Sequence, residues 1–253
     1  LLRIVVIEAA AANLGSMATP IGNPQNLYLY STYSFSLGTF FKTILPIVGI
    51  SYIGLLFSLL LIPQQPLAAE IPTESHLPLS AQKKNLIIYS ILGVVCLTTV
   101  AGLVTHVVCF CVVLLGIIVT DRALIRRVDW ELLLTFVCFF LFSGNLQQIE
   151  SVRNLMMQGL SGGVCLTAAL VSQVISNVPA AVLLSGFTEQ GKELLMGVDI
   201  GGLGTPIASL ASLIAYQYYA KSKLANPAKY LQFFFIYQFI GLFLLLAIKF
   251  IML

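Results

Sequence analysis

Long apolar stretches, separated by short polar segments, dominate the chain. Five of them approach the ~20 apolar residues that a helix needs to cross the hydrocarbon core of a bilayer. They are residues 43–62, 86–105, 107–120, 132–147 and 230–253. The second and third follow each other so closely that they are predicted to form a helical hairpin. Residues 63–85 are the one long polar segment and hold four prolines, which predicts a water-exposed loop.

Three other apolar segments are interrupted by polar residues and proline. Thr19-Pro20 lies within the first 30 residues, and Thr205-Pro206 lies within residues 194–219. Ser176-Asn177-Val178-Pro179 divides residues 159–187 into two arms, each too short for a full span. We expect a re-entrant hairpin at about 159–187 and a discontinuous helix at about 194–219.

The composition favours lipid as the main solvent. Hydrophobic residues make up 58% of the chain and charged residues only 9%, and the mean hydropathy is +0.97. A soluble domain carries about 25% charged residues. We therefore expect an all-α integral membrane protein in the plasma or inner membrane of the cell, with the lipid bilayer as a partner. The net charge is only +3, and no basic run long enough to follow a phosphate backbone occurs, so nucleic acid is not an expected partner.

The positive residues predict the orientation of the spans. They gather at Lys83-Lys84, at Arg122, Arg126 and Arg127, and at Lys221, Lys223 and Lys229. Short loops rich in Lys and Arg tend to stay in the cytoplasm. Two spans separate the first cluster from the second, so both fall on one side. The loop 63–85 is therefore predicted to be cytoplasmic, and residues 43–62 are predicted to begin outside.

Two stretches of the chain resemble each other. Residues 13–30 align with residues 199–216 at an offset of 186. Identical pairs are Gly15/Gly201, Thr19/Thr205, Pro20/Pro206, Ile21/Ile207, Leu27/Leu213 and Tyr30/Tyr216. An apolar span follows each copy, with Gly54 and Gly241 at matching places after a one-residue insertion. The chain thus contains an internal repeat.

The predicted orientation makes this repeat inverted, since the first copy runs from inside to outside and the second from outside to inside. Inverted repeats with interrupted helices are typical of secondary transporters. Residues 1–62 are predicted to end the first repeat, 63–85 to be the connecting loop, and 86–253 to be the second repeat. Several spans and a hairpin precede the second copy, whereas twelve residues precede the first. We therefore expect further N-terminal sequence in the natural protein.

The breaks carry groups that bind ions. Thr19-Pro20 and Thr205-Pro206 predict an N-cap threonine followed by proline at the first helical position. The N–H groups at the start of a half-helix favour an anion, whereas unwound backbone carbonyls suit a cation such as sodium. No metal site is assigned apart from such a sodium ion, and no cofactor beyond a coupling Na⁺ or H⁺ is expected. The candidate binding residues are Asn13, Gly15, Thr19, Asn23, Asn26, Ser176, Asn177, Asp199, Gly201, Gly202, Thr205 and Pro206.

Asp199 stands apart because an acid in an apolar segment is costly unless it is paired or faces water. Two interpretations remain open: a coupling or gating role, or a surface-near acid paired with Lys192. An enzyme is not expected, since the spans hold no Ser/His pair, no HExxH and no paired acids.

Two motifs are similar to the paired signatures of the ion-transporter superfamily. They are Gly15-Ser-Met-Ala-Thr-Pro-Ile-Gly-Asn-Pro-Gln-Asn26 and Gly197-Val-Asp-Ile-Gly-Gly-Leu-Gly-Thr-Pro-Ile-Ala-Ser209. This group includes citrate and divalent-anion/sodium symporters, arsenite-type efflux permeases and sodium/proton antiporters. The resemblance implies an inverted-repeat homodimer that holds substrate between hairpin tips and broken helices and moves it by an elevator-like motion.

The same resemblance places Ser176 and Asn177 on the hairpin's Ser-Asn pair. Val178 stands where the dicarboxylate branch has threonine, and the Gly-Val-Asp-Ile-Gly run is more similar to the arsenite-permease-like branch. We expect an ion-coupled secondary active transporter of a small anion, either a carboxylate or an inorganic oxyanion. The alternatives are a sodium/proton antiporter, with Asp199 as its central carboxylate, and an arsenite-type efflux permease.

Overall fold

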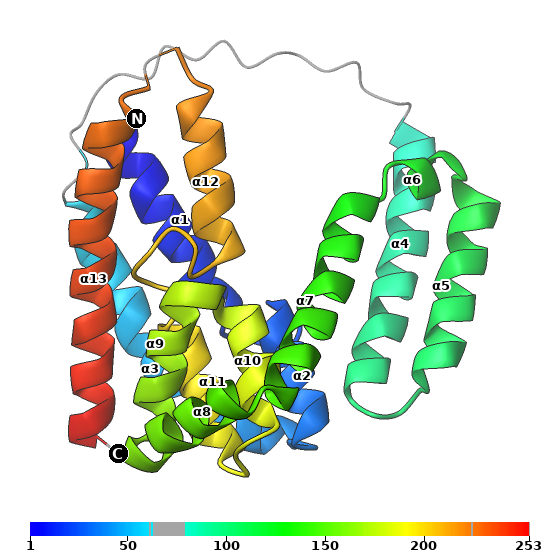
Figure 1. The fold of residues 1–253 in the computed structure, drawn as a ribbon. Helices are drawn as coiled ribbons and strands as arrows, with labels where there is room; N and C mark the ends of the chain where they lie inside the picture. Colours follow the sequence, from blue (N-terminus) through cyan, green and yellow to red (C-terminus); the bar gives the residue numbers. More distant parts are fainter. Residues whose placement is uncertain (61, 63–78, 224, 253) are drawn as a thin grey trace. The chain divides into compact units, whose positions relative to one another are not determined.

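The computed structural model describes residues 1–60, 62, 79–223 and 225–252, and within them it contains helices and no strands. The predicted all-α fold is confirmed. The chain divides into two compact units, one made of Leu1–Pro63 with Thr135–Leu253 and the other of Gln64–Leu134. Figure 1 labels the helices along the chain.

Within the described residues, three helices are long and apolar enough to cross a membrane: α3 (Leu37–Leu59), α7 (Trp130–Gln148) and α13 (Pro227–Met252). Large apolar side chains stand exposed on them, including Phe57, Leu141 and Phe243. Contact of such apolar faces with water is unfavourable, whereas the hydrocarbon of a bilayer is an apolar solvent for them. These helices support the prediction of an integral membrane protein.

The smaller unit holds a helical hairpin. Helices α4 (Leu79–Val100) and α5 (His106–Thr120) pack together, and the short α6 (Ala123–Arg126) follows. Gly116 lies against Leu92, whose side chain is 2.9 Å from where a Cβ on the glycine would stand. The predicted pairing of the second and third apolar stretches is therefore confirmed. Helix α4 begins inside the stretch 63–85 that was expected to be a loop, and residues 63–78 of that stretch lie outside the described residues.

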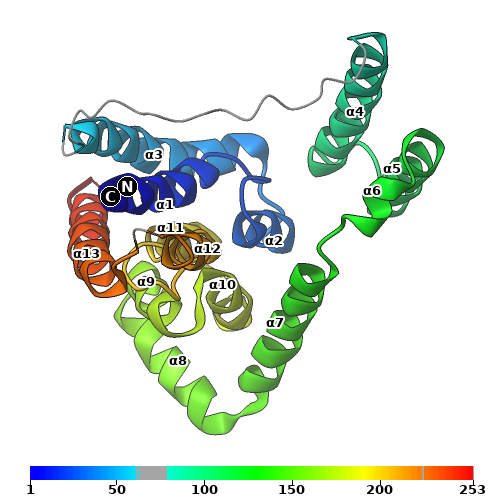
Figure 2. The ribbon, with the colours of Figure 1, turned by 90° about the horizontal axis from the view of Figure 1, so that it is seen from above.

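In the larger unit, α11 (Gly191–Ile200) and α12 (Leu210–Ala220) lie at the centre. Figure 2 shows α1 (Leu2–Ser16), α2 (Pro24–Thr32), α9 (Val164–Ile175), α10 (Asn177–Ser185) and α13 around them. Helix α11 packs closely on α9, because Gly197 and Gly201 face its backbone. A Cβ at these glycines would stand 2.5 Å from the Cys165 carbonyl oxygen and 2.7 Å from the Ala169 Cα.

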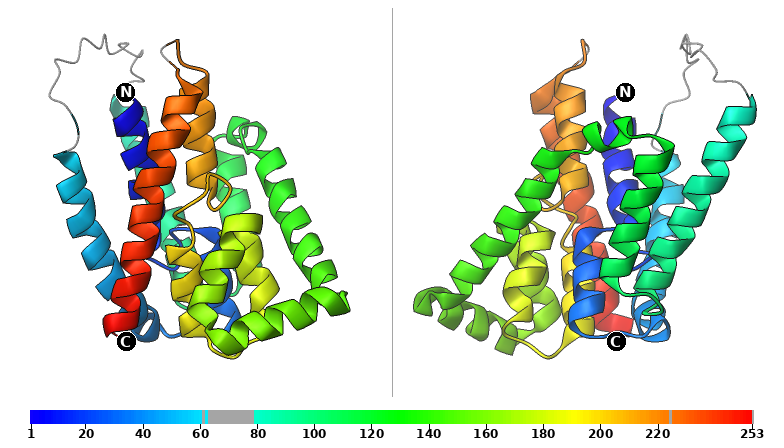
Figure 3. Two further views of the ribbon diagram at one scale, coloured as in Figure 1. Left: turned by 60° about the vertical axis from the view of Figure 1, so that its left-hand side comes forward. Right: turned by 90° about the vertical axis from the view of Figure 1, so that its right-hand side faces the viewer.

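Helices α9 and α10 double back on each other through the single residue Ser176, whose φ is 74°. Their 12 and 9 residues are too few for two full spans. In Figures 1 and 3 the pair occupies one half of the unit's height, with its turn beside the loop between α11 and α12. The sequence pattern predicts one hairpin over 159–187 and assigns no element to residues 148–158. The structure instead has a separate helix there, α8 (Glu150–Gly162), which Gly163 joins to α9 at a φ of 142°.

The two repeated stretches share one pattern of helix, break and helix. Helices α2 and α12 begin at Pro24 and Leu210, which are 186 residues apart, as in the sequence alignment. Their caps match as well, since Asn23 accepts a hydrogen bond from the Asn26 N–H and Ser209 accepts one from the Ser212 N–H. In Figures 1 and 3, α1 runs toward its break from one end of the unit while α12 runs from its break back to that end.

The predicted cap positions were wrong. The half-helices begin four residues after Thr19-Pro20 and Thr205-Pro206, with Asn23 and Ser209 as caps. Asn and Ser cap a helix at least as well as Thr, and Pro24 supplies the proline at the first helical position. Gly15 is also not part of the break, since it lies inside α1.

Candidate functional site

The tip of the hairpin is bonded to the second break. The Asn177 backbone N–H donates to the Ala208 carbonyl oxygen at 2.9 Å, and the Ser176 hydroxyl donates to the same oxygen at 3.4 Å. Asn177 is only 3% exposed, and its side-chain amide makes no hydrogen bond to another described residue. Beside the tip lies a cavity of about 320 Å³, lined on its polar side by Ser176 and Ser209. The cavity therefore offers two hydroxyls, and the buried amide of Asn177 belongs to the next residue of the tip.

The side chain of Gln173 binds the unwound backbone of the second break, between α11 and α12. Its Nε2 donates to the carbonyl oxygens of Gly201 at 2.8 Å and of Leu203 at 2.9 Å. Its Oε1 accepts from the Thr205 N–H at 2.8 Å, and the Thr205 hydroxyl donates to the Gln173 carbonyl oxygen at 2.9 Å. Unwound backbone away from water needs such partners. Thr205 therefore serves the fold of the break, and its hydroxyl is not a helix cap.

The sequence analysis missed Gln173, although one signal marks it. It is a polar residue within the apolar arm 164–175, one turn before the tip. Gly204 fits this arrangement because its φ of 111° suits glycine, and a Cβ there would meet the Gln173 side chain.

Asp199 lies at the end of α11 and is 2% exposed. Its Oδ1 accepts a hydrogen bond from Gln25 Nε2 at 3.2 Å, and its Oδ2 has no partner among the described residues. Gln25 belongs to α2, so the acid of one repeat reaches the half-helix of the other. Pairing with Lys192, one of the two interpretations of this acid, does not occur in the structure, where its partner is an amide.

Asparagines complete the first break. Asn26 Nδ2 donates to the carbonyl oxygens of Met17 at 3.2 Å and Thr19 at 3.3 Å, while its Oδ1 has no partner in the described part of the chain. Asn13, the repeat equivalent of Asp199, lies over Gly202, where a Cβ would stand 2.5 Å from its amide. Each repeat thus places its polar residue at position 13 or 199 against the other repeat.

Most of the predicted residues come together in two groups. The first group surrounds the first break and contains Asn13, Asn23, Asn26, Asp199 and Gly202. The second surrounds the hairpin tip and the second break and contains Ser176, Asn177, Gly201 and Thr205. The carbonyl oxygen of Thr19 belongs to the first group, since it accepts a hydrogen bond from Asn26 Nδ2. Pro206 lies in the second break, between α11 and α12.

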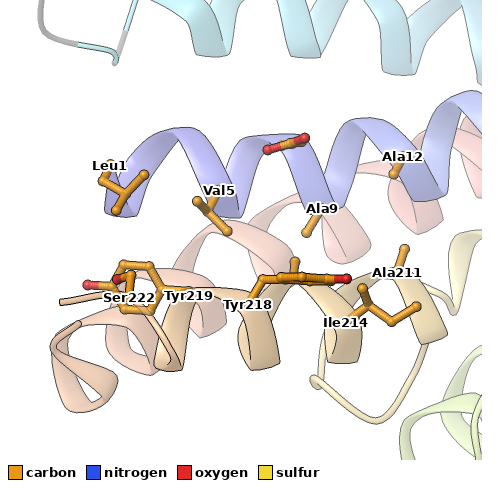
Figure 4. A pocket seen from close by; sticks show the side chains of 11 residues that line it. Leu1, Val5, Ala9, Ala12, Ala211, Ile214, Tyr218, Tyr219 and Ser222 are labelled. Atoms are coloured by element: carbon orange, nitrogen blue, oxygen red, sulfur yellow. The ribbon is translucent and has the colours of Figure 1, made fainter. Parts of the chain in front are cut away.

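A groove of about 440 Å³ runs between α1 and α12. Figure 4 shows small side chains facing each other across it, with Ala9 and Ala12 on one wall and Ala211 on the other. Ala12 precedes Asn13, and Ala211 is two residues beyond the Ser209 cap. The groove therefore ends near both breaks, and Glu8 is the charged residue in its lining.

A sequence model of the citrate transporter family, CitMHS, matches residues 1–189. The chain belongs to this family. It is similar to the inner membrane protein YbiR of Escherichia coli (strain K12), with 33% identity over 229 residues. It is also similar to the uncharacterized transporter MJ0456 of Methanocaldococcus jannaschii, with 32% identity over 212 residues. Both matches cover 84% of this chain.

Each match spans 57% of the relative's own length, so the chain corresponds to little more than half of these proteins. No solved structure matches the chain at a comparable level of significance. The chain is therefore part of a protein of the citrate transporter family, and its apolar helices are those of an integral membrane protein. The resemblance to the ion-transporter superfamily is confirmed at this level.

Proposed function

We propose that the full-length protein is a secondary active transporter of a small anion, either a carboxylate or an inorganic oxyanion. The observation that carries the proposal is the meeting of the hairpin tip with the second break. Helices α10 and α12 both begin there, and no capping side chain accepts a hydrogen bond from the N–H groups at the start of α10. Helix N-termini carry partial positive charge, and they bind anions well where water is scarce. The buried Asn177 amide adds a donor at the same point.

The coupling cation is proposed to bind at the first break. Two buried oxygens there, Asn26 Oδ1 and Asp199 Oδ2, have no hydrogen-bond partner in the described residues. Buried polar atoms are normally satisfied, so such a pair marks a place for a ligand. Helices α1 and α11 both end nearby, and the C-terminal ends of half-helices are partly negative. A sodium ion or a proton suits oxygens in this setting.

The repeat supports a transport cycle built on two inverted halves. Matching helix starts at Pro24 and Leu210, and the opposite directions of α1 and α12, favour an inverted repeat with a re-entrant hairpin. Family resemblance adds the homodimer and the elevator-like motion. Cation/proton exchange is the second candidate function, and the buried Asp199 carboxyl is the observation that favours it. An arsenite-type efflux permease is one form of the first candidate function. Val178 at the hairpin tip favours this form over a dicarboxylate carrier.

The test uses the full-length protein reconstituted in vesicles and measures binding and counterflow of labelled citrate and arsenite. Asn177→Ala removes the amide at the tip. A hydrogen bond to a charged group contributes about 1.5–3 kcal/mol, so the affinity for the anion should fall roughly ten- to hundredfold. Thr167→Val is the control, because Thr167 packs against Gly159 of α8 and not at the tip. Unchanged anion binding in Asn177→Ala, with normal expression, would place the anion site elsewhere.

A further inference from the structure

A second ion-binding feature lies away from both breaks. A cavity of about 570 Å³ opens between α3, α11 and α13. Its polar lining contains Lys42 of α3, Lys192 and Glu193 of α11, and Lys249 of α13. Each of the three helices thus contributes one lysine to a single cavity.

The cavity carries excess positive charge. Glu193 Oε2 accepts a hydrogen bond from Lys249 Nζ at 2.6 Å, and the two side chains form an ion pair. Three lysines and one glutamate leave two positive charges, which belong to Lys42 and Lys192. Neither of these makes a salt bridge to a described residue. Like charges that share a cavity repel each other, and an anion between them relieves the repulsion.

The lysines stand at helix ends. Lys42 lies in the second turn of α3, Lys192 in the first turn of α11 and Lys249 in the last turn of α13. The ends of helices long enough to span a bilayer lie near the boundary between hydrocarbon and water, where lysine directs its ammonium group to the polar side. Below the lysines the wall is apolar, with Pro46, Ile47, Ile50, Met196 and Ile248.

We propose that this cavity binds the headgroup of an anionic phospholipid. The two unpaired ammonium groups match a phosphate, and the apolar wall beneath them matches the start of an acyl chain. A lysine close to an acidic lipid headgroup adds to its binding, and an apolar wall removes part of an acyl chain from water. The lipid would connect α3, α11 and α13 at one end of the bundle, apart from the anion path at Asn177.

The experiment compares the full-length protein with Lys42→Gln/Lys192→Gln, which removes the two unpaired charges and leaves the Lys249–Glu193 pair intact. Thermal unfolding is measured in micelles as phosphatidylglycerol is added, with phosphatidylcholine and inorganic phosphate in separate arms. Each lysine near an acidic lipid contributes about a fivefold change in affinity, so the double variant should bind roughly thirtyfold more weakly. Phosphatidylglycerol should raise the unfolding midpoint of the parent, and the other two additives should not.

Lys221→Gln/Lys229→Gln is the matched control. These exposed lysines lie just after the C-terminus of α12 and in the first turn of α13, whereas Lys249 lies in the last turn of α13. It should respond to phosphatidylglycerol like the parent. The proposal is overturned if phosphatidylcholine stabilises equally, if inorganic phosphate suffices, or if the control loses as much as the test variant. Binding of the transported anion should persist in Lys42→Gln/Lys192→Gln, and its loss would assign these lysines to transport instead.

Discussion

Gln173 offers a sharp test of how the second break is held. Its side chain satisfies two carbonyl oxygens and one N–H of the loop between α11 and α12, all at distances of 2.8–2.9 Å. Gln173→Met keeps the length of the side chain and removes all three bonds. Each buried backbone group left without a partner costs about 1–3 kcal/mol, so the variant should lose at least ~3 kcal/mol of folding stability. That is a large part of the 5–15 kcal/mol typical of a folded domain.

The assay is thermal and chemical unfolding of the full-length protein in detergent, followed by anion binding on the folded fraction. Gln158→Met on α8 is the matched control, because Gln158 is exposed and its side chain makes no hydrogen bond to a described residue. Gln173→Glu is a second variant, which keeps an acceptor for the Thr205 N–H and lacks the donor for the two carbonyl oxygens, so it removes only part of the hydrogen bonding. If Gln173→Met unfolds like Gln158→Met, the break is held by other contacts and this reasoning is wrong.

Three further predictions concern charge, packing and topology. Asp199→Asn should abolish the dependence of transport on sodium or protons while anion binding persists, and loss of anion binding alone would argue against a cation site there. Gly201→Ala should destabilise the protein by about 1–3 kcal/mol, because its Cβ would stand 2.7 Å from the Ala169 Cα. Its repeat equivalent Gly15→Ala has no atom within 4 Å of the new Cβ, and in thermal unfolding it should be silent. Cysteines placed at positions 126 and 223, in a background without native cysteines, should react with impermeant reagents from the same side, and labelling from opposite sides would contradict the predicted orientation.

Three of the predicted apolar spans correspond to the long helices α3, α7 and α13. They could be predicted because a bilayer fixes both the length and the composition of a crossing helix. The repeat was equally visible, since Pro24 and Leu210 start their helices at the offset that the identical residues give. The exact helix starts could not be predicted in the same way. Thr, Asn and Ser cap helices with similar strength, so the choice of Asn23 over Thr19 depends on tertiary contacts such as those of Asn26.

The hydrogen bonds that could not be predicted from the sequence join residues that are far apart along the chain. Gln173 bonds to groups 28–32 residues away, and Gln25 reaches Asp199 over 174 residues. Neither pairing leaves a local pattern. Helix α8 was missed for another reason: Glu150, Arg153 and Gln158 give it a polar face, so it does not resemble a span.

Ser176 has a mechanical consequence. A serine at a φ of 74° is held in a conformation that costs of order 1–3 kcal/mol and that needs support from its surroundings. That support includes the Ala208 carbonyl oxygen, which accepts from both the Ser176 hydroxyl and the Asn177 N–H. Swinging the hairpin alone would break both bonds and release the strained turn. The hairpin and the second broken helix are therefore expected to move together as one rigid body, with any hinge lying outside the pair.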